Sequence, residues 1–505
     1  MLFKVKNSAL KADIAALASK VVSVIGPLIT VPLFIKYLTI EEYGIWLMVL
    51  SATSFFYLSN AGILQVVTNA VAKEIAEEKV NYYSQVASSG YYLFRTITIT
   101  ILIIFYVFFA TQYYFNLAIF NQGLLPLTIT VTCILLTYPL FVYRNVLRGL
   151  NYIHLEQSTD IVLGSLIRYT AVIVALISGF KLITLALIYG VTNCFPSFGA
   201  KYFLKRLIPK FNISRKNIDK KIMQSMIKPS ASFFVLMVSG SLLNSIDTLI
   251  IGTIIGADSV PMYAIPMTLI LLFHTSLGVI SSNKMPFMSG LYENKDFAEF
   301  RSLYTSLIFF SSMAAFIAVI NLIFFGETII VFWAGPEVFP GNKVFYLMLC
   351  FSLLFSIGWP SDSVLSAVEK HAPYANMTVI EAILNMILSI YLTLTYGIIG
   401  AISGTIIARL LTNGWFMFYQ ALKVLEYKIS DFLLWVLGNI LPPMALLSTI
   451  IFITSYYDLW NEYSIFLQII ILNILIFIVL FTTSRKNLLK LLDTFIRDNK
   501  SSVKG

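Results

Sequence analysis

KYFLKRLIPKFNISRKNIDKKIMQSMIK, the stretch Lys201–Lys228, divides the chain near its middle. It holds nine Lys and Arg residues against one acid, Asp219, and long apolar runs with almost no charge lie on both sides. A block this basic beside an apolar run indicates a cytoplasmic loop, because Lys and Arg resist translocation across a membrane. The stretch therefore predicts the orientation of the apolar segments before and after it.

The composition excludes a soluble globular protein. The chain has 505 residues, of which 58% are hydrophobic and 12% charged, and its mean hydropathy is +0.84. Soluble domains carry about 25% charged residues, whereas a bilayer accepts apolar surface on the outside of helices. The sequence predicts an all-α polytopic membrane protein. The net charge of +10 is explained by segments facing the anionic cytoplasmic leaflet, and no nucleic-acid partner is expected.

Windows of about 20 apolar residues predict fourteen transmembrane helices. Six precede the basic stretch, at 13–38, 43–69, 91–112, 123–143, 158–179 and 182–203. Eight follow it, at 230–255, 260–283, 304–325, 343–365, 374–396, 398–422, 433–455 and 463–483.

The positions of the basic residues support this topology. With a cytoplasmic N-terminus, the predicted inner segments hold 28 Lys and Arg residues and the outer loops hold three, Lys36, Lys181 and Lys343. Such an asymmetry is the positive-inside signal. It predicts an even number of spans with both termini cytoplasmic.

The spans are arranged as six, six and two, which predicts the domain organisation. We expect a six-helix bundle over 1–203, a basic cytoplasmic linker over 204–228, a second six-helix bundle over 229–423, two extra spans within 424–483 and a basic tail over 484–505. Residues 486–497 of the tail are expected to form an amphipathic interfacial helix. A short turn at 39–44 has a faint counterpart at 256–263, and such similarity between halves in one orientation indicates two related bundles.

Enzyme and metal signatures are absent from the sequence. It has no Gly-rich phosphate loop, no GxSxG, no HExxH and no long extramembrane segment. Cys133, Cys194 and Cys350 stand alone within apolar spans, so packed thiols are expected. No metal site and no cofactor are predicted.

Six ionisable residues inside predicted spans are the candidate site. Each charge near the bilayer centre costs about 2.5–3.5 kcal/mol, so these residues are predicted to face a wet internal cavity or one another. Buried basic residues suit an anionic ligand, since Arg forks onto phosphate, and buried Asp, Glu and His suit proton or cation coupling. Structural ion pairs or snorkelling side chains are the alternative. The predicted substrate-binding residues are Lys20, Arg168 and Arg409, and the predicted ion-coupling residues are Asp247, Glu381 and His274.

Two stretches resemble a known family. GPLITVPLFIKYLTIEEYGIWLMVLSATSFFYLSNAGI, Gly26–Ile63, is similar to the opening of polysaccharide flippases of the Wzx type, with a short turn ending in Glu-Glu-Tyr-Gly. SLLNSIDTLIIGTIIGADSVPMYAI, Ser241–Ile265, resembles the start of their second half, with an Asp in span seven and a Tyr opening span eight. The likeness extends to the superfamily that also holds MATE-type multidrug exporters and the lipid II flippase MurJ.

The resemblance implies two six-helix bundles in a V that alternate between inward- and outward-open states. It implies that they move an undecaprenyl-diphosphate-linked oligosaccharide across the bacterial inner membrane. In that case the basic residues would meet the cargo, and H⁺ or Na⁺ would couple through Asp247 or Glu381. Implied partners are the lipid-linked oligosaccharide, the membrane and other polysaccharide assembly proteins. Two alternatives stay open: a cation-coupled multidrug exporter, with which basic site residues agree poorly, and an integral-membrane enzyme of polysaccharide biosynthesis.

Overall fold

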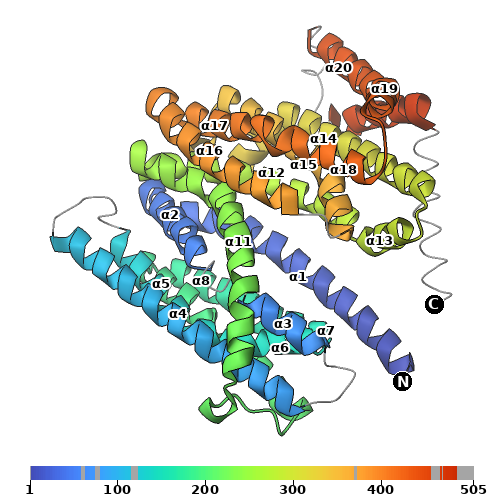
Figure 1. Cartoon of the computed structure of the whole chain (residues 1–505). Coiled ribbons are helices and arrows are strands. Elements are labelled where there is room, and N and C mark those ends of the chain that lie inside the picture. The colour runs from blue at the N-terminus through green and yellow to red at the C-terminus, as the bar shows by residue number, and fades with distance from the viewer. Residues whose placement is uncertain are drawn as a thin grey trace. The chain divides into compact units, whose positions relative to one another are not determined.

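The computed structural model describes residues 2–57, 63–73, 80–114, 123–368, 372–456, 467–468 and 470–485. Helices, joined by short turns, account for nearly all of these residues, and no strand occurs among them (Figure 1). The chain divides into two compact units. Unit 1 comprises Met1–Ile265, Trp333–Val338 and Ser389–Ala401, and unit 2 comprises Pro266–Phe332, Phe339–Leu388 and Ile402–Gly505. The predicted all-α membrane fold is confirmed, while the predicted domain boundaries stay a prediction.

Helices α1 to α11 lie in unit 1. Their bounds are α1 Leu2–Tyr37, α2 Ile40–Tyr57, α3 Ile63–Lys73, α4 Val80–Tyr114, α5 Leu124–Thr137, α6 Phe141–Gly149, α7 Ile153–Thr159, α8 Ile167–Ile177, α9 Leu182–Thr192, α10 Phe195–Leu207 and α11 Lys220–Ile254. Short segments η3 (Tyr138–Leu140), η4 (Asp160–Leu166), η5 (Arg215–Asn217) and η6 (Ala257–Ser259) join them. Within this unit α5 packs on α9, α3 on α6, and α2 on α11.

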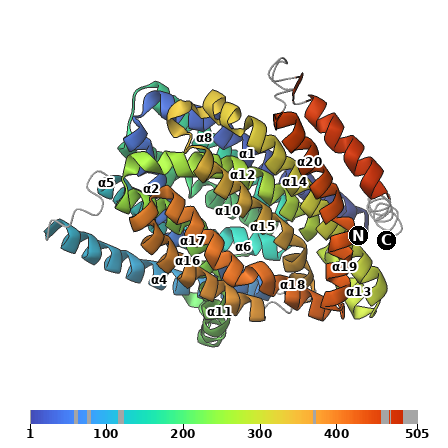
Figure 2. The ribbon, with the colours of Figure 1, turned by 90° about the horizontal axis from the view of Figure 1, so that it is seen from above.

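The later helices build most of unit 2. They are α12 Val260–Ser282, α13 Met285–Glu293, α14 Phe297–Ala334, α15 Asn342–Ala367, α16 Ala372–Tyr396, α17 Ile398–Leu411, α18 Asn413–Val424, α19 Ile429–Asn439, α20 Leu441–Tyr456 and a last helix within 470–485, with η7 at Pro336–Val338. Helix α15 packs on α18, and α16 and α17 lie side by side in both views (Figures 1 and 2).

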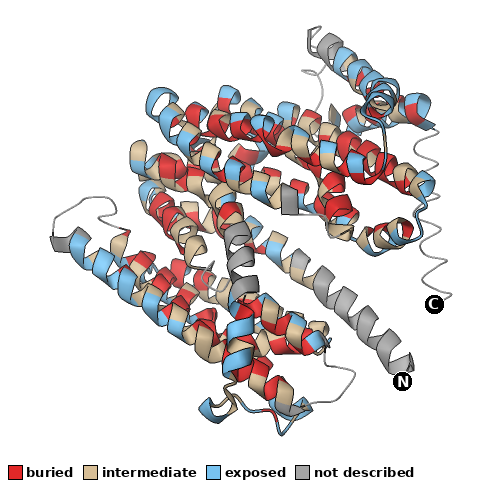
Figure 3. Ribbon diagram, in the orientation of Figure 1, coloured by how far each residue is buried: buried red, intermediate tan, exposed pale blue. Residues whose placement is uncertain are grey.

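Nine helical segments among the described residues are long and apolar enough to cross a membrane. Four shorter apolar helices, Val21–Tyr37, Ile63–Ala72, Val238–Ile254 and Ile470–Arg485, fall in other predicted windows. The exposed side chains of α4 include Ile103, Ile104 and Val107, and Figure 3 shows the exposed face running along that helix. An apolar exposed stripe of this kind is typical of a lipid-facing helix. The total of fourteen spans stays a prediction.

A capping box starts α2 after the short turn that follows α1. The Thr39 amide donates to Glu42 Oε2 at 2.9 Å, and the Glu42 amide donates to Thr39 Oγ1 at 3.1 Å. Two amides that a helix start leaves unpaired are thereby satisfied. Lys181 Nζ, next to α9, adds an ion pair to Glu42 Oε2 at 2.7 Å. The turn at 39–44 is thus held to the α8–α9 connection, which is also a predicted outer loop.

This turn predicts a pH-dependent contribution to stability. Partial burial raises the pKa of Glu42, but hydrogen bonds from Lys181 and Thr39 outweigh it and hold the pKa below its ordinary value of 4.5. Stabilisation by Glu42 is therefore present above that value and lost as the pH falls through the lowered pKa. We expect Glu42→Gln to cost about 0.5–1 kcal/mol at pH 7 and to flatten the acid limb of thermal stability measured in detergent. Its exposed neighbour is the control: Glu41→Gln removes a charge from the same first turn without touching the capping box or Lys181, so it should change both clearly less, and an equal effect would contradict the assignment.

Helix α1 contains Pro27 and Pro32. Pro32 has no N–H, so the Leu28 carbonyl four residues earlier lacks its helical donor. Trp333, at the end of α14 and part of unit 1, donates its indole N–H to that carbonyl at 2.9 Å. The indole therefore replaces the hydrogen bond that the proline removes.

The replacement can be measured by a double-mutant cycle. We expect Trp333→Phe to lower the free energy of unfolding by about 0.5–1.5 kcal/mol, because it removes the donor that the Leu28 carbonyl has in place of a helical N–H. Pro32→Ala supplies a helical N–H to the same carbonyl, so in that background Trp333→Phe should cost much less. Thermal unfolding of the four proteins in detergent gives the coupling energy. Equal losses in both backgrounds would show that the indole stabilises the helix in another way.

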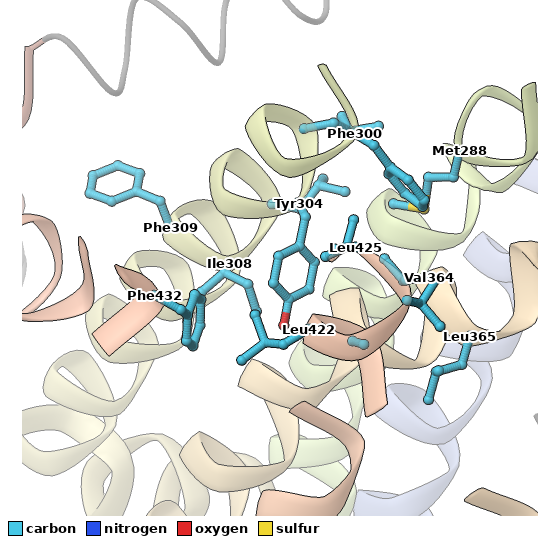
Figure 4. Close-up of a cluster of buried hydrophobic side chains, with 14 of the residues drawn as sticks. Met288, Phe300, Tyr304, Ile308, Phe309, Val364, Leu365, Leu422, Leu425 and Phe432 are labelled. Carbon is cyan, nitrogen blue, oxygen red and sulfur yellow. The ribbon is translucent and has the colours of Figure 1, made fainter. Parts of the chain in front are cut away.

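A continuous apolar cluster forms the core of unit 2. It includes Met288, Phe300 and Tyr304, and Figure 4 shows Tyr304 at the centre of the labelled side chains. Phe432 of α19 and Ile440, which follows that helix, belong to the same cluster, so the first of the two predicted extra spans is part of this core. A second cluster, made by Ile320, Phe325, Leu447, Leu472, Ile476 and Val479, packs α20 and the last helix on α14.

Candidate functional site

A buried ion pair joins α16 and α17 within unit 2. Arg409 Nη1 lies 3.1 Å from Glu381 Oε1 and 3.3 Å from Oε2. Arg409 and Glu381 are 5% and 3% exposed. Two charges this deep in a predicted span are compatible with folding because each compensates the other.

The ion pair is the first rung of a polar ladder between the two helices. One turn further along α16, Asn385 donates its amide to Thr405 Oγ1 at 3.4 Å. The next rung is formed by the Ser389 hydroxyl, which donates to the Ala401 carbonyl at 3.2 Å. Each step of four residues along α16 is matched by four residues back along α17, as expected of antiparallel helices facing one another. Glu381 and Asn385, which lie four residues apart on one face of α16, are therefore both hydrogen-bonded by the neighbouring helix.

The guanidinium of Arg409 is incompletely hydrogen-bonded. It lies 4.5 Å above the Phe355 ring, and Nη2 is 3.6 Å from Met417 Sδ, a weak acceptor. Nε has no acceptor among the described residues. A Cβ at Gly358 would lie 3.3 Å from Nη2, so glycine leaves room for the guanidinium. The guanidinium is thus held in place, while its Nε–H has no acceptor among the described residues and can donate to a ligand.

His274 of α12 contacts the same Phe355 ring as Arg409. Its ring meets Phe355 edge to face at 4.5 Å, Trp359 Nε1 donates to His274 Nε2 at 3.1 Å, and Nδ1 lies 2.9 Å from Ser356 Oγ. An indole N–H can only donate, so Nε2 is the acceptor and carries no proton. The imidazole is therefore neutral in this arrangement, with its proton on Nδ1. Protonation of Nε2 requires Trp359 to release it.

In unit 1, Asp247 of α11 is 5% exposed and accepts a hydrogen bond from the Tyr263 hydroxyl at 2.9 Å. These are the Asp and Tyr that the family resemblance singles out. Two residues earlier on α11, Ser245 Oγ accepts a hydrogen bond from Ser54 of α2 at 3.0 Å. Both bonds hold α11 to a neighbouring helical segment of unit 1.

Arg168 follows η4, a π-helical segment, at the start of α8. Its Nε donates to Thr192 Oγ1 at 3.0 Å, and its guanidinium lies 4.5 Å above the Tyr189 ring. The side chain is only partly buried, and no carboxylate among the described residues pairs with it. Asp160, two turns earlier, pairs instead with Arg144. Arg168 is therefore an available cation on the α8–α9 hairpin.

The six predicted residues fall into separate groups. Glu381, Arg409 and His274 gather in unit 2 around Phe355, while Asp247 and Arg168 occupy different places in unit 1. The side chain of Lys20 lies outside the described residues. Within the part of the chain that the structure describes, no group of three His, Cys, Asp or Glu side chains could hold a metal ion.

One charged network was not predicted. Buried Glu156 of α7, 3% exposed, pairs with Arg144 at 2.8 Å and Arg148 at 3.0 Å, and Arg144 also pairs with Asp160 at 2.8 Å. Arg144 and Arg148 were predicted only as two of the 28 basic residues of the inner segments, with no partner assigned. The two four-residue spacings, Arg144 to Arg148 and Glu156 to Asp160, were a sequence signal for facing charged helix surfaces. The network closes the α6–α7 connection.

Residues 10–291 match the family described as polysaccharide biosynthesis protein, which is more than half of the chain. The chain belongs to this family. A comparison with curated protein sequences gives no match.

Solved structures of transporters share the fold. The lipid II flippase MurJ, in an inward closed conformation, superposes with a TM-score of 0.70 at 17% identity, covering 94% of this chain and 99% of MurJ. An inward-facing multidrug resistance MATE transporter of the MOP superfamily gives 0.62 at 15% identity, covering 80% and 98%. A MOP superfamily transporter from Pyrococcus furiosus, described as having a binding pocket of reverse polarity, gives 0.53 at 14% identity, covering 84% and 97%.

The family match and the shared fold agree with the predicted resemblance to Wzx-type polysaccharide flippases with a MATE- and MurJ-like fold. The chain shares the multi-pass membrane fold of these transporters. Polysaccharide biosynthesis is the process with which the family is associated.

Proposed function

We propose that the protein moves an undecaprenyl-diphosphate-linked oligosaccharide from the cytoplasmic to the outer leaflet of the bacterial inner membrane by alternating access. Both termini are cytoplasmic in this proposal, as the positive-inside asymmetry predicts. The observation that carries it is the buried guanidinium of Arg409, which retains an unmatched donor at Nε. A phosphate oxygen is a stronger acceptor than the Met417 thioether, and guanidinium binds phosphate in a planar fork.

Glu381 gives this site a means of release. A diphosphate entering beside Arg409 competes with Glu381 for the same cation, so cargo binding loosens the ion pair. When the cargo leaves, the pair forms again and compensates both buried charges. Lys20 and Arg168 are proposed as further anion contacts, on the phosphates or on acidic sugars.

Coupling to an ion gradient is proposed for the carboxylates and the imidazole. Glu381 freed from Arg409 can take up H⁺ or Na⁺, and Asp247, a second buried carboxylate, is proposed for the same role. His274 is proposed for this role as well. It contacts the same Phe355 ring as Arg409, and its protonation breaks the hydrogen bond from Trp359.

A leaflet-resolved assay tests the proposal. Cells lacking the protein should accumulate undecaprenyl-linked repeat units on the cytoplasmic leaflet, and the protein in proteoliposomes should translocate them. Arg409→Lys keeps the charge but loses the planar fork, so we expect the rate to fall about tenfold or more. Lys343→Gln, which removes an exposed cation from a predicted outer loop, is the control. Normal glycan export without the protein would refute the proposed cargo.

A cation-coupled drug exporter is the second candidate. It is favoured by the buried carboxylate of Asp247 and by the fold shared with MATE transporters. It predicts resistance to toxic cations and dye efflux on expression, both lost in Asp247→Asn. The same strains measured for glycan export and for efflux separate the two candidates.

A further inference from the structure

The basic stretch at the middle of the chain is an ordered loop rather than a loose tether. Helix α10 extends to Leu207 and α11 begins at Lys220, so residues 208–219 make the connection. Three buried serines on one side of α4 accept hydrogen bonds from its backbone amides. The bonds are Asn212 N to Ser84 Oγ at 3.3 Å, Ser214 N to Ser88 Oγ at 3.1 Å and Asp219 N to Ser89 Oγ at 3.0 Å.

Further contacts hold both ends of the loop. Phe211 is 5% exposed and meets Tyr143 of α6 edge to face at 6.4 Å. The Asn217 side chain donates to the Asn212 carbonyl at 2.9 Å. Ser89 also donates its hydroxyl to the Asp219 carbonyl at 3.2 Å, so one serine binds both polar groups of that residue. The path of the backbone is thus determined by unit 1 itself.

Seven cations project from this loop and its flanking helix ends. They form what we call the basic surface: Lys205, Arg206, Lys210, Arg215, Lys216, Lys220 and Lys221, all exposed. The single acid of the stretch, Asp219, lowers the charge of this surface by one at most, and its carboxylate caps α11 by accepting from the Lys221 and Ile222 amides at 2.8 and 3.1 Å. None of the seven forms an ion pair with a described carboxylate.

The basic surface lies next to an apolar helix end. The candidate membrane span Leu182–Leu207 contains Lys205 and Arg206 in its last turn. Tyr202 and Leu207, 60% and 39% exposed, are apolar neighbours on the same helix, and Ile227, 53% exposed, follows on α11. Exposed apolar residues directly beside exposed cations are typical of a segment at the level of lipid headgroups.

We propose that the basic surface binds the headgroups of anionic phospholipids at the cytoplasmic face of the membrane. The chemistry is that of ammonium and guanidinium groups meeting phosphodiesters, and because the serines already hold the backbone, only the side chains have to be ordered at binding. The role is independent of the transported cargo. In this proposal the connection between α10 and α11 binds lipid as well as linking the two helices.

The test measures lipid preference with the full-length protein. In nanodiscs of phosphatidylcholine containing spin-labelled lipid, the wild type should bind labelled phosphatidylglycerol several-fold more strongly than labelled phosphatidylcholine. Changing Lys210, Arg215 and Lys216 to glutamine should reduce this preference by about fivefold or more at low salt. In 0.5 M NaCl the preference of the wild type should also fall, since salt screens exposed charges.

Two controls test whether the lipid preference depends on this ordered basic surface or only on the net charge of the protein. Lys343, Lys423 and Lys428 are exposed basic residues of unit 2, and changing these three to glutamine removes the same charge. An equal loss of preference in that variant would overturn the proposal. Ser88→Ala/Ser89→Ala keeps all seven cations but frees the backbone, and we expect about a twofold loss; an unchanged preference there would overturn the role of the ordered loop.

Discussion

Replacing Arg409 with methionine is expected to lower the free energy of unfolding by about 3–5 kcal/mol, because the change leaves Glu381 charged and unpaired inside unit 2. Glu381→Met should cost a similar amount, since it strands the guanidinium. The double variant should recover most of this loss, as two apolar side chains replace two buried charges. Thermal unfolding in detergent, read as a double-mutant cycle, measures the coupling.

The same proteins separate a structural ion pair from a functional one. If the pair only holds α16 to α17, the double variant is stable and transports normally. If Arg409 binds the cargo, the double variant is stable and inactive. We expect the second result, because the apolar variant has no donor for a phosphate. Normal transport by the stable double variant would refute the proposed role of both residues.

The helices themselves were largely predictable from sequence. Apolar length is a local property of the chain, so windows such as 123–143 and 343–365 coincide with helical segments. Boundaries were less predictable where polar residues continue a helix beyond its apolar part. Helix α11, for example, begins at Lys220 inside the basic stretch, where Asp219 supplies the cap.

The sequence predicted which ionisable residues belong to the candidate site, but it did not predict which of them pair with one another. Glu381 and Arg409 were assigned to different roles, and their pairing depends on the antiparallel register of α16 and α17, set by the turn at Gly397. The matching four-residue steps of the ladder were visible in the sequence once that hairpin was assumed. The contacts of Phe355 with Arg409 and His274 had no sequence signal, because an aromatic residue in an apolar span carries no mark of its contacts.

The turns at 39–44 and 256–263 illustrate the same limit. Their similarity suggested a repeat, yet the structure brings them into direct contact within unit 1. Gly44 of α2 lies against η6, and a Cβ built on it would lie 1.7 Å from the Ala257 carbonyl oxygen and 3.3 Å from Pro261 Cδ. The atom that blocks it belongs to the backbone, so no side-chain rotation relieves the overlap.

Gly44→Ala is therefore expected to lower the free energy of unfolding by about 3 kcal/mol or more, because α2 and η6 must separate to admit one methyl group. Gly240→Ala is the matched control: it adds the same atom in α11, where a Cβ meets nothing within 4 Å, and a helical Gly-to-Ala change is neutral or stabilising by up to about 1 kcal/mol. Thermal unfolding in detergent, with the yield of monodisperse protein, compares the two. A loss confined to Gly44→Ala would show that unit 1 requires the close packing of the Glu-Glu-Tyr-Gly turn. Equal stability of both variants would show that α2 and η6 lie further apart than in the structure.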